Sequence, residues 1–251
     1  MYRTLTQHDL FKEFDLTEAE IPHGLIVHGS LNITGNLEIW KGLLRDSKLL
    51  RHHNILLGKD GETTIAFAVT YGSPMTSEVV HIAAVLGAKI VVQTGGFGGL
   101  QRGMKVGDLL IPTDAFRADG ASDWYLPKEE KADASPDVIA WFAEECERRQ
   151  LNYHLGQQFT TTALMAERWE DIVRWNKEGF SGVDLETATT FAVAKHFGMK
   201  RGAILRLLDN LIEGHTLLAL TNDERERLRK GNMVLFELAL SAVRRFTNDN
   251  P

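Results

Sequence analysis

The chain has 251 residues, long enough to bury a large core, and its 43% hydrophobic and 25% charged residues are an ordinary globular composition. A net charge of −6, with basic residues spread along the chain, excludes nucleic acid and anionic membrane surfaces as expected partners. No apolar segment approaches membrane-spanning length, and the single cysteine, Cys146, cannot form an intramolecular disulfide, so we expect a cytoplasmic protein.

Short apolar runs alternate with helical patterns along the sequence, which is typical of a mostly parallel sheet covered by helices. The chain shows no repeat and no low-complexity linker. We therefore predict a single α/β domain over residues 1–251, with a central mixed, mostly parallel, twisted sheet flanked by helices. The expected strands are 24–29, 64–72, 89–95, 108–116, 153–161 and 202–209.

Capping residues mark the expected helices. Thr76 or Ser77 is expected to cap a helix over 76–87, which ends at a glycine. Thr221 and Glu224 have the spacing of a capping box at the start of the last helix. The other helices are expected over 135–149, 184–198 and 221–245.

Four glycines lie at and just after the end of the strand predicted over 89–95, in the stretch VVQTGGFGGL (91–100). Glycine loses more backbone entropy on folding than any other residue, so such a run needs a reason. The two usual reasons are positive φ angles and close approach of the main chain to a ligand or another element. The run lies at the carboxyl end of the strand, where ligands collect in such sheets.

Two carboxylates begin the helix predicted over 184–198. Asp184 and Glu186 in a first helical turn interact favourably with the helix dipole, which is the simpler explanation. A carboxylate that points into a cleft can instead accept both hydrogen bonds of a sugar cis-diol. Spacing alone leaves both interpretations open.

Asp209 and Asn210 end the apolar strand GAILRLLDN, at the edge where the sheet opens to ligand. A turn or a helix cap is the simpler role for such a pair. In a partly desolvated site, Asp209 could hold a proton near neutral pH and donate it to a leaving group.

The order of three segments resembles the nucleoside phosphorylase family, which contains uridine phosphorylase, hexameric purine nucleoside phosphorylase and methylthioadenosine nucleosidase. The segments are YGSPMTSEVVHIAAVLGAK, VVQTGGFGGLQRGMKVGDLLIPTDAFRADGASDWYLP and GVDLETATTFAVAKHFGMKRGAILRLLDN. The resemblance covers about residues 64–245. It implies an enzyme that cleaves the N-glycosidic bond of a nucleoside with phosphate as acceptor, and RADGAS favours the phosphorylase branch.

The resemblance implies roles for the carboxylates. Glu186 matches the glutamate that binds the ribose 2′- and 3′-hydroxyls, Asp184 matches the glutamate before it, and Leu185 replaces the methionine under the sugar. Asp209 matches the aspartate that protonates a purine leaving group. Uridine phosphorylases generally lack this aspartate, so a purine-like base is favoured over a uridine-like one.

The implied base pocket lies in TTTALMAERW, where Thr162 and Met165 flank Leu164, which stands at the family's aromatic stacking position. Ala166-Glu167-Arg168 is similar to the Gln-Glu-Arg with which uridine phosphorylases bind uracil, although the glutamine is missing. Arg168 is a candidate base contact, and a solvated helix charge is the slightly favoured alternative.

The implied phosphate region departs from the family pattern. Gln93 and Gly96 stand where the phosphorylases have an arginine and a serine, and Ile33 stands in place of a second arginine. Loss of two guanidinium groups removes strong charge-assisted contacts. We expect the glycine run to approach the ribosyl end of the ligand. The phosphate or nucleophile region is Gly29, Gln93, Thr94, Gly95 and Gly96, with Arg51 as a residue donated by a neighbouring subunit.

Two alternatives remain open. A nucleosidase would use water, but the sequence offers only Glu38 near the position of the required base. A catalytically inactive nucleoside-binding protein is the second alternative, motivated by the departures at Ile33, Gln93, Gly96 and Leu164.

The resemblance also implies a homo-oligomer, either a dimer or a hexamer. No metal-ligand spacing is present, and we expect no cofactor besides inorganic phosphate as co-substrate. We interpret Arg206, Arg225 and Arg227 as surface charges. The possible site histidines are His8, His52, His53 and His81.

Overall fold

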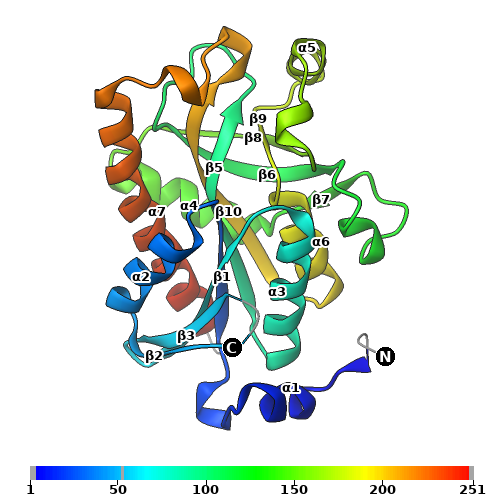
Figure 1. Ribbon diagram of the computed structural model, residues 1–251, viewed down its shortest axis with the longest axis vertical. Helices are drawn as coiled ribbons and strands as arrows, with labels where there is room; N and C mark the ends of the chain where they lie inside the picture. The colour runs from blue at the N-terminus through cyan, green and yellow to red at the C-terminus, as the bar shows by residue number, and fades with distance from the viewer. Residues whose placement is uncertain (1–3, 52–53, 249–251) are drawn as a thin grey trace.

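The computed structural model describes residues 4–51 and 54–248, and it has helices on both faces of one mixed sheet (Figure 1). The predicted α/β fold is confirmed. The strands are β1 (Gly24–Gly29), β2 (Arg45–Leu49), β3 (Ile55–Asp60), β4 (Thr63–Thr70), β5 (Ile90–Gly99), β6 (Leu109–Arg117), β7 (Lys131–Asp133), β8 (Tyr153–Thr160), β9 (Gly182–Asp184) and β10 (Lys200–Asn210). The helices are α1 (Gln7–Phe14), α2 (Ile33–Leu43), α3 (Ser73–Leu86), α4 (Pro136–Arg148), α5 (Trp169–Lys177), α6 (Thr187–His196) and α7 (Asn222–Asn248).

Parallel strands form the centre of the sheet. β5 pairs with β1 over its first half and with β10 over its whole length, and β1 also pairs with β4, all in parallel. β10 continues to β6, β6 to β8, β8 to β9, and β9 returns to β5. These five strands therefore close into a ring, while β1, β4, β3 and β2 extend the sheet away from it.

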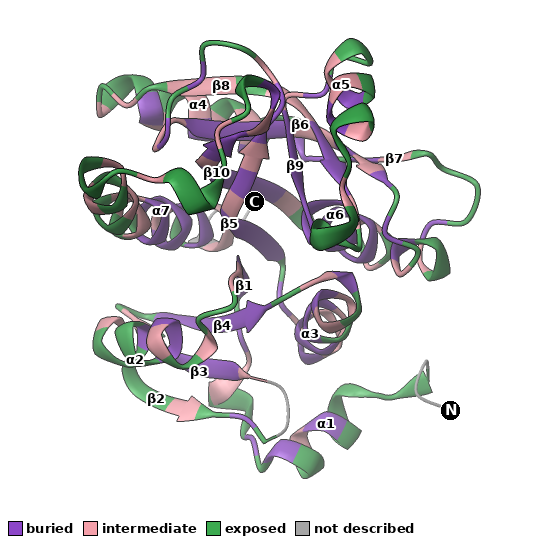
Figure 2. Ribbon diagram, turned by 45° about the horizontal axis from the view of Figure 1, so that its top comes forward, coloured by how far each residue is buried: buried purple, intermediate pink, exposed green. Residues whose placement is uncertain are grey.

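Apolar side chains pack on both faces of this sheet. On one face, α2, α4 and α7 bury Trp40, Phe142 and Phe236 against strand residues. On the other face, α1, α3 and α6 contribute Phe14, Val80 and Val193 to a second cluster. Figure 2 shows buried strands between helices whose outer sides are exposed.

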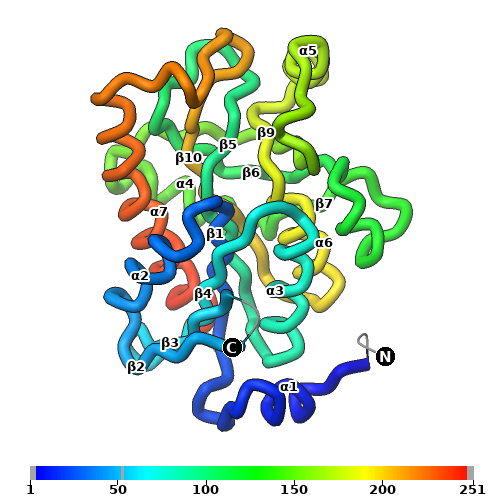
Figure 3. Tube along the Cα trace, viewed as in Figure 1, coloured from blue at the N-terminus to red at the C-terminus, as the bar shows by residue number. Residues whose placement is uncertain are grey.

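After β10 the chain passes the carboxyl edge of the sheet before it enters the last helix. From β10 it passes over the top of the view through two short 3₁₀ turns, Leu211–Glu213 and Leu217–Ala219, and then descends as α7 (Figure 3). Thr221 and Glu224 form the predicted capping box at this point, through Thr221 N–H to Glu224 Oε2 at 2.8 Å and Glu224 N–H to Thr221 Oγ1 at 3.2 Å.

The strand predicted over 89–95 extends through the glycine run. Gly95–Gly99 continue β5 and pair with Leu205–Asn210 of β10. Only Gly95 of the four has a positive φ, at 151°. A Cβ on Gly96 would stand 2.3 Å from Leu208 Cδ1, and one on Gly98 would stand 2.6 Å from Leu211 Cδ1. The glycines therefore serve close packing of another element, where the sheet bends into the ring.

Several boundaries differ from those predicted. α3 begins at Ser73 with Gly72 as N-cap, before the expected caps at Thr76 or Ser77. α6 begins at Thr187, because residues 182–184 pair with β5 and β8 as strand β9.

Candidate active site

Glu186 lies between the ends of two central strands. It is the N-cap residue of α6 and is buried, and its Oε1 accepts a 2.7 Å hydrogen bond from the backbone N–H of Gly72, just after β4. Its Oε2 lies 2.6 Å from the place where a Cβ on Gly29 would stand, at the end of β1. Only glycine at position 29 leaves room for this carboxyl group.

Asp184 is buried two residues before Glu186, and both of its oxygens are engaged by the protein. Oδ1 accepts from the Thr160 hydroxyl at 2.7 Å, and Oδ2 accepts from the N–H of Thr187 at 3.2 Å and from its hydroxyl. Burial raises the pKa of Asp184 to about 6. Asp184 thus holds the junction of β8, β9 and α6 in place. Its predicted contact with ribose stays a prediction.

The charge state of Glu186 follows from these surroundings. Burial first, and the neighbouring Asp184 carboxylate second, raise the pKa of Glu186 to about 8. Glu186 is therefore largely protonated at neutral pH and can donate one hydrogen bond while accepting others. The next residue toward the strand, Leu185, is buried, and its carbonyl accepts from the Ser73 hydroxyl at 2.7 Å.

Asp209 is buried at the end of β10, on the same edge of the sheet. A register shift between Leu207 and Asp209 re-aims its side chain, and Oδ2 accepts from the N–H of Leu217 at 3.0 Å. Burial raises the pKa of Asp209 to about 6, against the lowering effects of the Leu217 N–H and of His215.

The strand pairs of Gly98 show how far apart Asp209 and the strand before Glu186 lie. It pairs with Asp209 of β10 on one side and with Val183 of β9 on the other. Two strand spacings separate the backbones of Asp209 and Val183, which is about 10 Å. Glu186 follows three residues after Val183, so the fold brings Glu186 and Asp209 to one region.

Glu167 is a residue that the sequence interpretation passed over in favour of its neighbour Arg168. Its Oε1 is buried and has no hydrogen-bond partner among the described residues. Burial first, then the charges of Asp209 and Asp171, raise the pKa of Glu167 to about 7. The signal was present in the segment Ala166-Glu167-Arg168, which is similar to the uracil-binding motif.

The other residues expected to contact the base are exposed. Thr162 and Leu164 lie at the surface, and Met165 is 95% exposed. The Arg168 side chain is 71% exposed and pairs with Asp171, with 3.1 Å between Nε and Oδ2. This geometry fits the solvated-charge interpretation of Arg168. A role of these residues in base binding stays a prediction.

The polar side chains of β5 expected near phosphate form hydrogen bonds within the protein. Gln93 donates from Nε2 to the Thr94 carbonyl at 2.9 Å and accepts from the Thr190 hydroxyl at 2.7 Å. The Thr94 hydroxyl donates to the Val27 carbonyl at 3.1 Å. Arg51 is exposed, just after β2, which is compatible with a role in a neighbouring subunit.

Arg206 is not a surface charge, so that interpretation is wrong, whereas Arg225 and Arg227 are exposed as expected. Arg206 is only 8% exposed; it lies on β10, and its side chain packs against Gly231 of α7. Its Nη1 donates to the carbonyl of Leu228. Sequence reasoning missed it because an arginine inside a strand usually points to solvent.

The remaining candidates are placed as follows. His8 is exposed, and His81 accepts from or donates to the Tyr125 hydroxyl at 2.9 Å. His52 and His53 lie outside the described residues. Glu38, the candidate base for hydrolysis, is on the exposed side of α2 and pairs with Lys41 at 2.6 Å.

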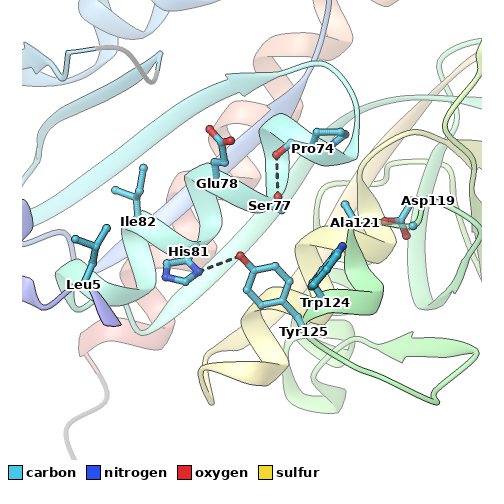
Figure 4. A pocket seen from close by; sticks show the side chains of 11 residues that line it. Leu5, Pro74, Ser77, Glu78, His81, Ile82, Asp119, Ala121, Trp124 and Tyr125 are labelled. Carbon is cyan, nitrogen blue, oxygen red and sulfur yellow. Dashed lines mark hydrogen bonds between the residues drawn. The ribbon is translucent and has the colours of Figure 1, made fainter. Parts of the chain in front are cut away.

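A surface pocket of about 790 Å³ lies beside this region, between α3 and the segment 119–125. Figure 4 shows its walls, with His81 and Tyr125 joined across it and Trp124 at its rim. Trp124 is 79% exposed. The pocket adjoins the site through Pro74, two residues after Gly72.

Residues 4–51 and 54–248 contain no group of His, Cys, Asp and Glu side chains suited to a metal ion. In the same part of the chain, every helix is too short or too polar to cross a bilayer.

Comparison with known proteins agrees with the geometry. The sequence profile of the Phosphorylase superfamily matches residues 45–244. A guanosine phosphorylase of Halorubrum lacusprofundi is 27% identical over 237 residues, covering 90% of this chain and 98% of that protein. The uridine phosphorylase of Escherichia coli is 26% identical over 165 residues, or 60% of this chain and 65% of that protein.

A solved structure shares the fold. The crystal structure of uridine phosphorylase from Vibrio fischeri superposes with a TM-score of 0.80 at 22% identity, covering 98% of this chain and 100% of that one. Together with the profile match over most of the chain, these similarities confirm the resemblance seen in the sequence. The chain belongs to the phosphorylase superfamily, as a member of its nucleoside phosphorylases.

Proposed function

We propose that the protein cleaves the N-glycosidic bond of a purine nucleoside with inorganic phosphate. A phosphate oxygen forms a bond to C1′ of the ribose, and the C1′–N bond breaks with its electron pair going to the base. The base takes up a proton, so that free base and ribose 1-phosphate leave. Glu186 binds the ribose hydroxyls, and Asp209 supplies the proton.

The observation that carries this proposal is Asp209, a buried carboxyl group whose pKa is raised to about 6 by burial. A group with this pKa keeps a protonated fraction near neutral pH and can act as a general acid. The guanosine phosphorylase that aligns over nearly its whole length supports a purine as the base. Hydrolysis is not supported, because Glu38 faces away from the site and pairs with Lys41.

The test is release of free base from guanosine, inosine and uridine, measured by chromatography with and without phosphate. We expect phosphate-dependent release of guanine and hypoxanthine. Asp209→Asn lowers kcat for these purines by about 10²–10⁴-fold, which is the usual contribution of a positioned acid. Asp133→Asn is the control, because Asp133 is exposed on β7 and pairs with Lys195.

Equal release without phosphate would show that the enzyme is a hydrolase. Full activity of Asp209→Asn on purines would remove the proposed role of Asp209. An absence of turnover with all three nucleosides, despite their binding in calorimetry, would favour an inactive binding protein.

We also propose that the protein works as a homo-oligomer in the cytoplasm without a resident cofactor. The apolar pocket with Trp124 at its rim supports a contact with a second copy, since large exposed apolar patches mark interaction sites. The single, buried cysteine fits a reducing compartment.

A further inference from the structure

Arg206 carries a buried positive charge that the described part of the chain does not neutralise. Its only hydrogen bond there is from Nη1 to the Leu228 carbonyl, and no carboxylate forms an ion pair with it. Its Nε is fully buried and has no hydrogen-bond partner within residues 4–51 and 54–248. Burial lowers the pKa of Arg206 to about 10, so the guanidinium stays charged at neutral pH. Buried charges are normally paired, so this cation lacks an anion.

The glycine at position 231 leaves space for the Arg206 side chain beside α7. A Cβ on Gly231 of α7 would stand 3.0 Å from Arg206 Cδ, so the glycine makes room for the arginine stem. Leu228, which accepts from Nη1, lies nearly one turn closer to the start of α7 than Gly231. Because α7 begins at the carboxyl edge of the sheet (Figure 1), the side chain points toward that edge.

The neighbouring His28 adds no positive charge beside Arg206 at physiological pH. Burial first, and the charge of Arg206 second, lower the pKa of His28 to about 3. His28 is therefore neutral at physiological pH, and its Nδ1 lies 3.0 Å from the Thr94 hydroxyl. Of the His28 and Arg206 side chains, only Arg206 is therefore positively charged.

The position of Arg206 along β10 places it beside the ribose-binding region. Arg206 of β10 pairs with Gly96 of β5. The residue before Gly96, Gly95, pairs on the other side with Gly29, the last residue of β1. On that side of β5, β1 ends opposite Gly95 and the pairing with β9 begins at Gly98, so no described strand pairs with Gly96 and Phe97 there. The backbones of Arg206 and Gly29 are two strand spacings apart, about 10 Å. Glu186 packs directly on Gly29.

The residues that occupy the family's phosphate positions supply no charge here. The Gln93 amide is bonded to Thr94 and Thr190, and Ile33 packs against the core on α2. The backbone of Gly95–Gly99 belongs to the ladder with β10 and does not form an anion-binding turn. Besides the Arg51 expected from a neighbouring subunit, a phosphate at this edge therefore needs a cation from this chain.

We propose that Arg206 binds the inorganic phosphate co-substrate, entering the site from the α7 side of the sheet in place of the missing arginines. This inference rests on the proposed function, since it concerns the acceptor of that reaction. The guanidinium offers its unpartnered N–H groups to two phosphate oxygens and balances the charge of the dianion.

The test compares Arg206→Met and Arg206→Lys with the wild type, using guanosine and inorganic phosphate. We expect Arg206→Met to raise the KM for phosphate by about tenfold to a hundredfold, as for loss of a hydrogen bond to a charged group. The KM for guanosine changes little. Arg206→Lys keeps the charge but loses the planar fork, so its phosphate KM lies between the two.

Arg201→Met is the matched control, because Arg201 lies at the opposite end of the same strand and bonds to the Asp133 carbonyl at 2.6 Å. Phosphate binding is also measured without nucleoside, as the rise in Tm between 0 and 50 mM potassium phosphate against potassium chloride of equal ionic strength. We expect this rise in the wild type and in Arg201→Met, and its loss in Arg206→Met.

The outcomes separate this inference from the proposed function. A wild type without phosphorolysis contradicts the proposed function, whereas phosphorolysis with an unchanged phosphate KM in Arg206→Met contradicts only the role of Arg206. Equal increases in the KM for phosphate and for guanosine, with a lowered Tm and no intermediate effect of lysine, would identify a purely structural arginine and overturn the inference.

Discussion

Glu186 is a buried carboxyl group whose ionisation costs stability. Its carboxyl group is buried next to Asp184 and has a single backbone donor, the N–H of Gly72. Ionising it there is costly, because burial and the neighbouring carboxylate both disfavour the charge. The folded protein therefore retains a proton on Glu186 at pH values where the unfolded chain has released it.

The raised pKa of Glu186 determines the direction in which the stability of the folded protein changes with pH. The pKa of Glu186 is about 8 in the folded state against an ordinary value of 4.5, so stability falls as pH rises from 4.5 to 8. Glu186→Gln removes this loss because the amide does not ionise. We expect the Tm of Glu186→Gln to exceed that of the wild type by at least about 4 °C at pH 8, and by much less at pH 5.

Thermal unfolding followed by circular dichroism at pH 5, 6.5 and 8 measures this difference. Glu38→Gln, on the exposed side of α2, is the control and leaves the pH profile unchanged. A constant difference between wild type and Glu186→Gln across these pH values would contradict the assignment of a buried, protonated carboxyl group.

At the scale of elements, β5 explains why the sheet can turn from an open layer into a ring. Its first half lies between β1 and β10. In its glycine-rich second half, the side chains of Leu207, Leu208 and Leu211 lie so close to the backbone that they leave no room for a Cβ atom on the glycines they contact. The glycines are thus a packing requirement of the neighbouring leucines.

Substitution of Gly96 tests this explanation. A Cβ there would stand 2.3 Å from Leu208 Cδ1, so Gly96→Ala destabilises the protein by about 1–3 kcal/mol through overpacking. Gly42→Ala is the matched control, since no atom lies within 4 Å of a Cβ at this helical position. That control stabilises by about 0.5–1 kcal/mol, as expected for alanine in a helix.

Urea denaturation monitored by fluorescence gives both values. The double variant Gly96→Ala/Leu208→Ala is expected to regain part of the loss, because removal of the leucine side chain makes room for the new methyl group. Additive costs of the two substitutions would show that they do not meet, and would contradict a steric origin.

The sequence predicts the elements whose pattern is strong. The strands at 24–29 and 202–209 and the capping box at Thr221 lie where expected, because apolar runs and capping residues are local signals. β2 was not predicted because RDSKL is an exposed polar edge strand. Its lysine and arginine suit an edge that must not pair with another chain.

Only the site residues that lie in a recognisable sequence motif could be predicted. Glu186 and Asp209 follow from their motifs, and the fold places both at one edge. The inward orientation of Glu167 and the burial of Arg206 depend on what packs over them. For Arg206 this is α7, whose Gly231 and Leu228 lie more than twenty residues further along the chain. No local pattern contains this information.

At the scale of the whole molecule, the pocket beside α3 is the feature that an isolated chain does not explain. It combines Leu5, Ile82 and Trp124 with the rim of the active site at Pro74. An interface at this position would let a second copy of the chain complete the site, as Arg51 was expected to do.

The oligomer proposal predicts a change in mass. The wild type is expected to sediment as a dimer or hexamer, and Trp124→Asp shifts it toward the monomer, because a charge replaces a large apolar side chain in a desolvated contact. Trp169→Asp is the matched control, as Trp169 is 54% exposed on α5, away from this pocket. Sedimentation equilibrium gives the masses. A wild-type monomer, or equal behaviour of the two variants, would contradict the proposal.

The bond from the Gly72 amide to Glu186 joins residues 114 positions apart, and Arg206 is enclosed only after α7 has docked. A ribosome-bound fragment that lacks the last helix therefore possesses no finished pocket, however much secondary structure it has acquired. A ligand that binds only the native state stabilises it by mass action, so we expect any ligand of this site to stabilise only chains in which α7 has docked.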